Sequence, residues 1–365
     1  MATLDLTRWL ELVAGAAIVG LILYDVFSAV IVPRQVSPAW RLSGAFVPNA
    51  WRRWRAAALL IRDEDRREDF LARFAPGVLV ALLILWLVFL LVGYGLIFYA
   101  LRDHMLPPIK TYFDAVYFAG TSLLTIGYGD MVATSVIGRL AAIAAGATGL
   151  ALFAILISFI FSIFGSFQRR EIFVVTMGSR MGAPPSGVTL LETVAKYRLE
   201  DDLAQGFRDA ENWAATVLES HLAYPILAFF RSSHDDESWI GTLGALLDAS
   251  TMIITLTDSP IMGHAKLFHT IGVHLTRDLS RYFRVAQTEE VGIERSEFDA
   301  ACAHLTQAGV AVRCDDAAWQ KFSELRAQYA GPLNDMAHFW LIPPTRWVGD
   351  RSAIGRRAMH AAAAK

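Results

Sequence analysis

A run of six residues, Thr125–Asp130, could bind a cation with its main chain; it reads Thr-Ile-Gly-Tyr-Gly-Asp. A dehydrated cation needs a cage of oxygen atoms, and consecutive main-chain carbonyls supply one only if they point to the same side. That arrangement alternates left-handed and right-handed backbone, and Gly127 and Gly129 adopt the left-handed form at almost no cost. The run therefore predicts a cation-coordinating loop in which Ile126 and Tyr128 point outward and pack against the preceding segment.

The segments around this loop indicate that it lies within a membrane. Tyr112–Leu124, directly before it, is half apolar, rich in aromatic residues and too short to cross a bilayer. Three other runs are long and apolar enough to cross: Leu12–Val32, Pro76–Ala100 and Leu140–Phe167. A short helix that enters the membrane and an irregular loop that leaves it are stable only where protein surrounds a watery path. We therefore expect a re-entrant helix and loop between the second and third spanning helices.

The composition agrees with a membrane protein and argues against other classes. Of the 365 residues, 55% are hydrophobic and 19% are charged, whereas soluble domains average about 25% charged, and the mean hydropathy is +0.40. The net charge of −2 argues against a nucleic-acid partner held by bulk charge. The two cysteines, Cys302 and Cys314, cannot build a disulfide framework and lack the spacing of metal ligands.

The arginines predict an orientation in the cell membrane. Nine of them fall between Arg34 and Arg73, and a loop so rich in arginine stays on the cytoplasmic side. The N-terminus is then outside, and the region from Glu171 onward is cytoplasmic. The charge divides in the same way, with 15 basic and 11 acidic residues up to Arg170 against 18 and 24 after it.

The run Thr125–Asp130 resembles the selectivity-filter signature of the tetrameric potassium-channel family, with isoleucine where valine is usual. The resemblance extends further along the chain. Gly138 and Arg139 stand at the distance at which the two-transmembrane bacterial members open their inner helix, and Gly149 stands at the position of their hinge glycine. The resemblance covers under a third of the chain. It implies a pore module of outer helix, pore helix, filter loop and inner helix over residues 76–170.

The resemblance also implies roles for the residues of the loop. Potassium would be the permeant ion, no organic cofactor is implied, and the Thr125 hydroxyl would complete the innermost ion site. One chain would supply a quarter of each oxygen cage, which implies a homotetramer in the lipid bilayer. The filter residues that would coordinate potassium are Thr125, Ile126, Gly127, Tyr128 and Gly129.

Several nearby positions depart from the family pattern. Tyr117 and Phe118 replace two tryptophans, and Thr121 stands where one member of the family has a glutamate. Leu124 replaces the usual threonine just inside the filter. We expect Tyr117 to donate a hydrogen bond to Asp130, so that Tyr117, Thr121 and Asp130 support the filter. These departures bear on the stability of the filter rather than on its selectivity for potassium.

The sequence divides into six expected segments. They are an N-terminal transmembrane helix (1–33), a basic cytoplasmic or interfacial linker helix (34–75), the pore domain (76–170), a linker (171–186), a helical cytoplasmic domain (187–350) and a flexible tail (351–365). The fold class expected is therefore an all-α membrane protein, in which a pore module carries one extra N-terminal helix and a helical cytoplasmic domain.

The basic linker does not have the pattern of a voltage sensor. Its arginines do not repeat every third residue, and they do not lie in a membrane-spanning segment. Trp40–Ile61 instead predicts an amphipathic helix on the inner membrane surface. Asp25, an acid inside the first span, is expected to find a partner among Arg34–Arg55.

The cytoplasmic half is typical of a helical domain. Apolar residues recur at steps of three and four in the stretches Leu203–His221, Trp239–Ile253 and Phe268–Leu279. A shorter helix, Trp319–Tyr329, is expected behind the cap Asp315-Asp316. Two other elements are predicted here, a strand at Ile172–Met177 and a linker at Gly182–Pro185.

The sequence of this half does not match the motifs of known regulatory or catalytic modules. Gly178 and Gly182 do not have the spacing of a dinucleotide-binding loop, and a cyclic-nucleotide barrel would need many strands. His264, His269 and His274 are five residues apart and so do not share one face of a helix, which argues against a metal site. The sequence offers no catalytic motif, so we do not expect an enzyme.

Three functions remain open at this point. The first is a potassium-selective tetrameric channel that the cytoplasmic domain assembles or gates, with an unidentified ligand of that domain left open. The second is a membrane-anchored sensor or scaffold whose pore does not conduct. The third is a cation channel with weak selectivity.

Overall fold

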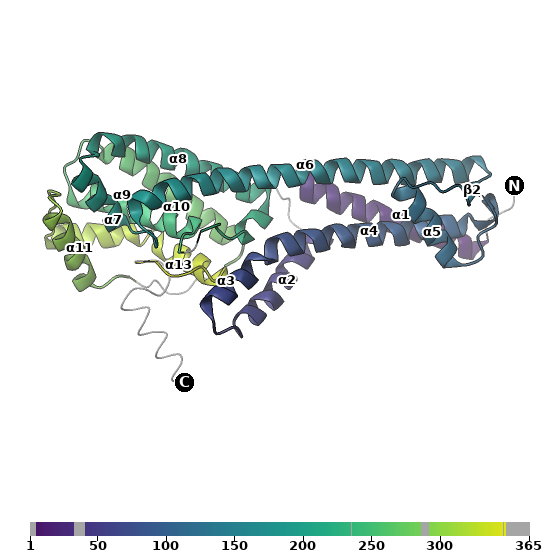
Figure 1. The fold of residues 1–365 in the computed structure, drawn as a ribbon, viewed down its shortest axis with the longest axis horizontal. Coiled ribbons are helices and arrows are strands. Elements are labelled where there is room, and N and C mark those ends of the chain that lie inside the picture. Colours follow the sequence, from purple (N-terminus) through teal and green to yellow (C-terminus); the bar gives the residue numbers. More distant parts are fainter. Residues whose placement is uncertain (1–4, 33–40, 235, 286–291, 346, 348–365) are drawn as a thin grey trace. The chain divides into compact units, whose positions relative to one another are not determined.

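The computed structural model describes residues 5–32, 41–234, 236–285, 292–345 and 347. The chain forms two compact units, Met1–Phe164 and Gly165–Lys365. The described residues are mainly helical, and their only strands, β1 (Met105–Leu106) and β2 (Val132–Ala133), form one antiparallel pair (Figure 1). The expectation of an all-α protein is confirmed.

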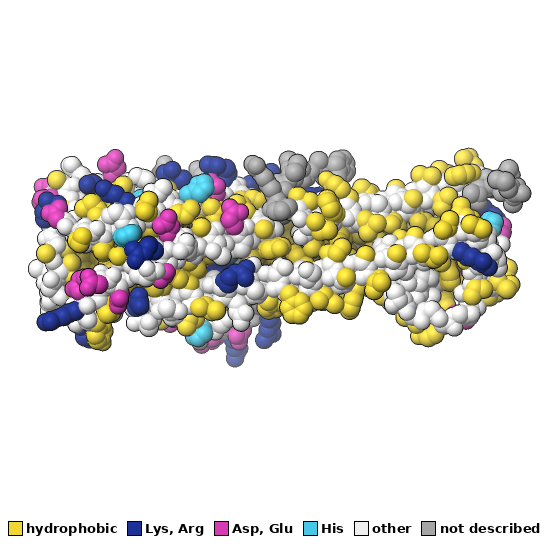
Figure 2. All heavy atoms as spheres, turned by 90° about the horizontal axis from the view of Figure 1, so that it is seen from above, with side chains coloured by type: hydrophobic (Ala, Val, Ile, Leu, Met, Phe, Trp, Pro, Cys, Tyr) yellow, Lys and Arg dark blue, Asp and Glu magenta, His cyan; other side chains and the backbone are white. Residues whose placement is uncertain are grey.

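The first unit contains the three expected spanning helices. They belong to α1, α4 and α6, which are long and apolar enough to cross a membrane. Figure 2 shows hydrophobic side chains over much of the surface of this unit, as expected for helices that face lipid. Its elements are α1 (Leu6–Val26), the π-helical turn η1 (Phe27–Ile31), α2 (Leu42–Ala58), α3 (Glu64–Ala72), α4 (Phe74–Ala100), η2 (Arg102–His104), α5 (Tyr112–Leu123) and the first part of α6 (Val136–Met181).

The extra helix α1 packs closely along α4. A Cβ built on Gly15 of α1 would be 2.6 Å from the main-chain oxygen of Gly93 on α4, so the two backbones touch where both residues lack a side chain. Two ion pairs join α1 to η2, which follows α4: Arg8 with Asp103 and Arg102 with Glu11. The first helix is therefore an integral part of the unit rather than a separate anchor.

The partners of Asp25 correct the sequence expectation. Asp25 is 1% exposed, and its carboxylate accepts hydrogen bonds from the main-chain N–H of Ser43 (3.1 Å), the Ser43 hydroxyl (2.9 Å) and the indole N–H of Trp86 (2.7 Å). One partner does lie in the expected segment, but it is a serine rather than an arginine. A buried acidic group is stable only when it accepts hydrogen bonds. Three uncharged donors provide these bonds here, without a second buried charge.

The predicted amphipathic helix forms as α2, with its tryptophans turned toward α3 and α4. Trp54 stacks on Phe70 with 4.4 Å between ring centroids, and its indole N–H donates to the Phe70 carbonyl. Trp51 is 3% exposed and lies 4.9 Å from the ring of Phe74. Trp40 lies outside the described residues. The tryptophans of α2 therefore have protein partners; whether this helix also rests on a membrane surface stays a prediction.

The second unit is a helical domain built around α9. Every residue of α9 is buried, and α7, α10, α12 and α13 pack against it. Its polar residue Asp248 accepts hydrogen bonds from the Arg326 guanidinium (3.2 Å) and the Tyr329 hydroxyl (2.7 Å). The elements after α6 are α7 (Gly187–Tyr197), α8 (Glu200–Ala223), the 3₁₀ turn η3 (Pro225–Phe229), α9 (Trp239–Leu256), α10 (Met262–Tyr282), α11 (Arg295–Gln307), α12 (Asp316–Arg326) and α13 (Ala330–Phe339).

The helices predicted in this unit are confirmed, but the predicted strand is wrong. The three amphipathic stretches form α8, α9 and α10, and Asp315 caps α12 by accepting from the Ala318 N–H at 2.8 Å. Ile172–Met177, however, lies within α6, which continues to Met181. Val174, Met177 and Met181 are buried at steps of three and four, and this helical stripe outweighs the β-branched character of the segment.

A fully buried arginine holds the C-terminal part of α6 within the second unit. Arg170 is 2% exposed and donates to the Glu171 carboxylate (2.8 Å) and to the carbonyls of Leu227 (3.0 Å) and Phe230 (2.8 Å). One of its nitrogens also lies 3.3 Å from Nε2 of His221 on α8. The guanidinium fork, which offers five donors in a fixed plane, thus satisfies buried carbonyl groups at the end of η3.

Candidate functional site

The loop Thr125–Asp130 follows α5, which forms over the predicted re-entrant segment. Thr111 and Asp114 close the start of α5 in a capping box, in which each side chain accepts from the main-chain N–H of the other residue. The helix ends at Leu123, and Leu124 continues the last turn with its N–H bonded to the Gly120 carbonyl at 2.9 Å. The cap fixes where the helix begins and so determines which residues enter the loop.

Contacts with α4 hold α5 in place. Phe118 of α5 meets Phe98 of α4 edge to face, with 4.8 Å between ring centroids. A Cβ built on Gly95 would be 2.7 Å from Cγ2 of Val116, so α4 and α5 approach most closely where α4 has a glycine. The Tyr112 hydroxyl donates to the Val92 carbonyl at 3.0 Å.

The inner helix α6 joins the same core through its contacts with both neighbours. The Tyr94 hydroxyl of α4 lies 2.7 Å from the Thr148 hydroxyl and 3.3 Å from the Ala144 carbonyl of α6. Gly149 of α6 lies directly against the carbonyl of Leu123, the last residue of α5. The three helices therefore meet at the point where the loop begins.

The backbone of the loop alternates as the sequence predicts, and the alternation also includes Thr125. Gly127 and Gly129 have φ of +60° and +78°, and Thr125 has φ of +56°. Positive φ thus recurs at every second residue. The sequence did not predict it at Thr125, because only the glycines indicate a left-handed backbone. A left-handed conformation costs a non-glycine residue roughly 1–2 kcal/mol.

A bifurcated hydrogen bond stabilises the start of the loop. The main-chain oxygen of Thr121 accepts from the N–H groups of Ile126 (2.8 Å) and Gly127 (3.1 Å). The Thr121 side chain is buried and donates to the Phe118 carbonyl at 3.1 Å. Thr121 therefore acts on the loop through its carbonyl, since its hydroxyl is used within α5.

A two-residue ribbon encloses the loop from its other end. β1, before α5, pairs with β2, after the loop, in the register Met105 to Ala133 and Leu106 to Val132. The Thr134 main-chain N–H and hydroxyl both donate to the His104 carbonyl at 2.9 Å. Sequence reasoning missed this ribbon because two-residue strands carry no periodic signal.

The expected link between α5 and the end of the loop is present. The Tyr117 hydroxyl donates to Oδ2 of Asp130 at 2.8 Å. The packing expected for Ile126 and Tyr128, in contrast, is not found within one chain, where these side chains are 49% and 70% exposed. The short helix of the same chain does not cover them, because α5 turns its buried face toward α4 instead.

The loop is the part of the structure with the chemistry of a cation site. It offers consecutive carbonyl oxygens and one hydroxyl, which are hard ligands suited to a hard monovalent or divalent cation. Elsewhere in the described part of the chain, no group of three His, Cys, Asp or Glu side chains could hold a metal ion. The three histidines of α10 are separate: Arg208 contacts His264, His269 is buried, and His274 pairs with Asp278.

Comparisons with known proteins show a similarity over the region that contains this loop. Residues 81–166 match the family model described as "Ion channel". A curated relative, the uncharacterized membrane protein YdjJ of Bacillus subtilis (strain 168), is 22% identical over 208 residues, which are 56% of this chain and 59% of the relative. The match thus spans about three fifths of the relative's length, and no solved structure matches the chain. The chain is an all-α membrane protein, and its similarity to the ion-channel family lies in a region that includes α5, the loop and most of the spanning part of α6.

Proposed function

We propose that the chain is one subunit of a homotetrameric potassium-selective channel of the cell membrane. The observation that carries this proposal is the alternating positive φ at Thr125, Gly127 and Gly129, in a loop with the sequence of a potassium filter. Alternation turns successive carbonyls to one side, where they can replace the water shell of a potassium ion. The hydroxyl of Thr125 would complete the innermost site.

The exposed side chains of the loop support assembly with further copies. Tyr128 is 70% exposed, Ile126 is 49% exposed, and Phe113 at the start of α5 is 78% exposed in the single chain. Large apolar groups at the position of an ion path are stable when protein covers them. Four copies around one axis would cover them and would complete each oxygen cage, of which one chain supplies a quarter.

The orientation proposed for the channel follows from the arginine-rich segment. The N-terminus would be outside, the short connection with β1 would lie at the outer surface, and the second unit would be cytoplasmic. Because α6 continues without interruption from Val136 to Met181, the inner helix leads directly into that unit. The second unit would assemble or gate the pore through this helix, and Arg170 would anchor the helix end.

Flux measurements on the purified full chain in liposomes test the proposal. We expect potassium uptake far above sodium uptake in the wild-type protein, and loss of that selectivity in Gly127→Ala, since φ of +60° strains an alanine. Gly77→Ala is the matched control, because both glycines have open space around a Cβ within the chain but Gly77 lies in a helix.

Each outcome of these measurements discriminates among the functions. Equal sodium and potassium fluxes in the wild type would support a weakly selective cation channel. No flux from a protein that is tetrameric by light scattering would support a sensor or scaffold. Unchanged selectivity in Gly127→Ala would overturn the assignment of the filter.

A further inference from the structure

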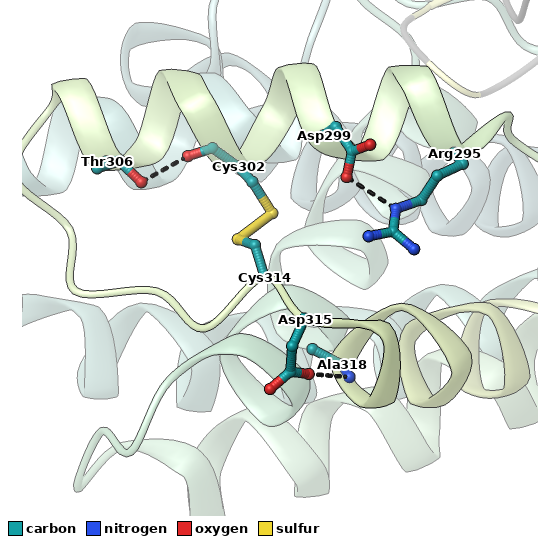
Figure 3. The surroundings of a disulfide bond; sticks show 7 residues. All are labelled: Arg295, Asp299, Cys302, Thr306, Cys314, Asp315 and Ala318. Atoms are coloured by element: carbon teal, nitrogen blue, oxygen red, sulfur yellow. Dashed lines mark hydrogen bonds and ion pairs between the residues drawn. A yellow bond between two sulfur atoms is a disulfide. The ribbon is translucent and has the colours of Figure 1, made fainter.

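The second unit contains a disulfide that joins the two cysteines of the chain. Cys302 and Cys314 are bonded with their Cα atoms 6.3 Å apart (Figure 3). Cys302 lies within α11 and is 5% exposed, and Cys314 is half-buried directly before Asp315, the cap of α12. Two cysteines are too few for a framework of several disulfides, but they do form this one bond. It closes a loop that leaves α11 and returns at the start of α12.

The closed loop lies against the end of α9. The Arg313 main-chain N–H donates to the Leu256 carbonyl at 2.7 Å, and the Arg313 guanidinium donates to Asp258 at 2.8 Å. At the other end of the loop, the Val310 N–H donates to the Leu305 carbonyl at 2.9 Å. The main-chain N–H groups of Ala308 and Gly309 also donate to the carbonyls of His304 and Thr306, and the Arg313–Asp258 pair is well exposed to solvent. The disulfide adds a covalent restraint that closes the segment between Cys302 and Cys314.

This loop forms one wall of a cavity. The cavity has a volume of about 350 Å³ and is lined by Gly309, Val310 and Ala311 from the loop, with Leu203 of α8 and Ile253 of α9 among its other walls. Its size falls within the range of small-molecule sites, about 300–1,000 Å³. A change in the order of residues 308–313 would therefore change the shape of a ligand-sized space.

The chemistry of this bond depends on the compartment. The topology proposed above, on which this inference rests, places the second unit in the cytoplasm, where thiol systems keep most cysteines reduced. Disulfides that form there are typically transient or redox-sensing rather than structural. A cross-link whose loss would free one wall of a cavity fits the sensing role.

We propose that Cys302 and Cys314 form a thiol–disulfide exchange site through which low-molecular-weight thiols control the order of the cavity wall, residues 308–313. A thiolate attacks Sγ of Cys314, the more exposed residue, the S–S bond breaks, and Cys302 leaves as a thiolate that takes up a proton. A second thiol then attacks the mixed disulfide and releases the Cys314 thiol. Two thiols are oxidised to one small disulfide, and the protein bond takes up two electrons and two protons. The reverse sequence, with the small disulfide as oxidant, restores the cross-link.

The test uses the purified full chain in lipid nanodiscs, treated with dithiothreitol or with oxidised glutathione without denaturant. Mass spectrometry after maleimide labelling counts the free thiols, and hydrogen exchange reports the order of each peptide. We expect two thiols after reduction, none after oxidation, and exchange in residues 303–313 that is about tenfold faster in the reduced protein. Peptides of α9 and α10 should keep their protection in both states.

The control is the double variant C302S/C314S, which should show the fast exchange of the reduced protein under every condition. The wild-type comparison needs no variant, so it stands even if the double variant folds poorly. A bond that the native protein does not exchange with dithiothreitol, or exchange rates in 303–313 that are equal in both states, would overturn the proposal.

Labelling in intact cells separates this inference from the proposed channel. After an oxidant pulse and acid quenching, we expect the fraction of disulfide to rise and then to fall as the cells recover. A bond that remains fully oxidised throughout would overturn the exchange role, and a membrane-impermeant maleimide shows whether the site is outside. None of these readouts depends on potassium flux, so failure of the channel proposal would be recognised separately.

Discussion

Gly149, in the first third of α6, lies against the carbonyl of Leu123 at the end of α5, so closely that a Cβ built on the glycine would overlap that oxygen. The family resemblance assigns Gly149 the role of a hinge, but α6 is a continuous helix through this position. Within one chain the glycine is needed for contact, because a Cβ at this position would overlap the carbonyl group of Leu123. A hinge role and a packing role predict different outcomes for substitution.

Gly149→Ala should disrupt the junction of α5 and α6. The added methyl group overlaps a main-chain oxygen directly before the loop, so we expect a loss of about 1–3 kcal/mol of stability or more, and loss of selective flux. Gly146→Ala is the control, since its Cβ would be 3.5 Å from the Ser122 carbonyl, an ordinary contact. If Gly149→Ala keeps its thermal stability and selectivity but changes only open probability, the hinge role is the better explanation.

Tyr117→Phe should weaken the filter without changing its ligands. The substitution removes the 2.8 Å hydrogen bond from the Tyr117 hydroxyl to Asp130 at the end of the loop. We expect a lower potassium-to-sodium flux ratio and faster loss of flux during an assay. Tyr112→Phe on the same helix removes a hydroxyl that donates to the Val92 carbonyl instead, and it should leave selectivity intact. Equal behaviour of the two variants would argue against a role for the Tyr117 bond in the filter.

His221 should make the second unit sensitive to acid. Burial, together with the positive charge of Arg170, lowers the pKa of His221 from 6.5 to about 3. Its Nδ1 donates to the Val217 carbonyl at 2.8 Å, so Nε2 is the unprotonated nitrogen that faces Arg170. The folded protein therefore keeps a neutral imidazole over a pH range in which the unfolded chain takes up a proton.

The sign of the pH effect follows from that difference. The pKa of His221 is lower in the folded protein than in the unfolded chain. The neutral imidazole therefore contributes stability that is fully present above about pH 6.5 and is lost progressively down to about pH 3. At pH 5 the loss is about 2 kcal/mol. Denaturant titration of the full chain at several pH values measures it, and His221→Gln, which does not titrate, should show a smaller slope. An unchanged slope in the variant would mean that other groups dominate the acid response.

Asp25 should contribute to the stability of the first unit through its three hydrogen bonds. Asp25→Ala leaves the Trp86 indole N–H and the Ser43 donors buried without their acceptor, at a cost of about 1–3 kcal/mol for each unsatisfied group. Ser43→Ala removes only the hydroxyl donor, with little change in buried volume, and should cost less. Thermal unfolding of the purified protein followed by tryptophan fluorescence compares the two. A melting temperature that is unchanged in Asp25→Ala would contradict a structural role.

Much of the membrane unit was predictable because its constraints are local. A bilayer of fixed thickness requires about 20 consecutive apolar residues, and α1, α4 and α6 show this directly in the sequence. The alternation of backbone conformation was predictable at Gly127 and Gly129 for the same reason, since glycine is the residue that adopts positive φ freely. It was not predictable at Thr125, whose conformation depends on how the chain leaves α5.

The second unit was less predictable because neighbouring helices decide how each segment is buried. The apolar stripe of Trp239–Ile253 indicated a helix with one buried face, yet α9 is buried on every side. The β-branched run Ile172–Met177 indicated a strand, yet it continues a helix whose buried stripe begins upstream. Intrinsic preference of a short segment is a weak guide where packing provides most of the stabilisation.

By itself, the sequence determined which segments can enter a membrane, where the backbone can offer a row of carbonyls, and where several helices of the second unit end. These features depend on residues that are neighbours in the chain. The tertiary structure alone decided that Gly149 supports Leu123, that Ser43 and Trp86 serve Asp25, and that Cys302 reaches Cys314. Such contacts join residues far apart in the sequence, and no local pattern encodes the packing that brings them together.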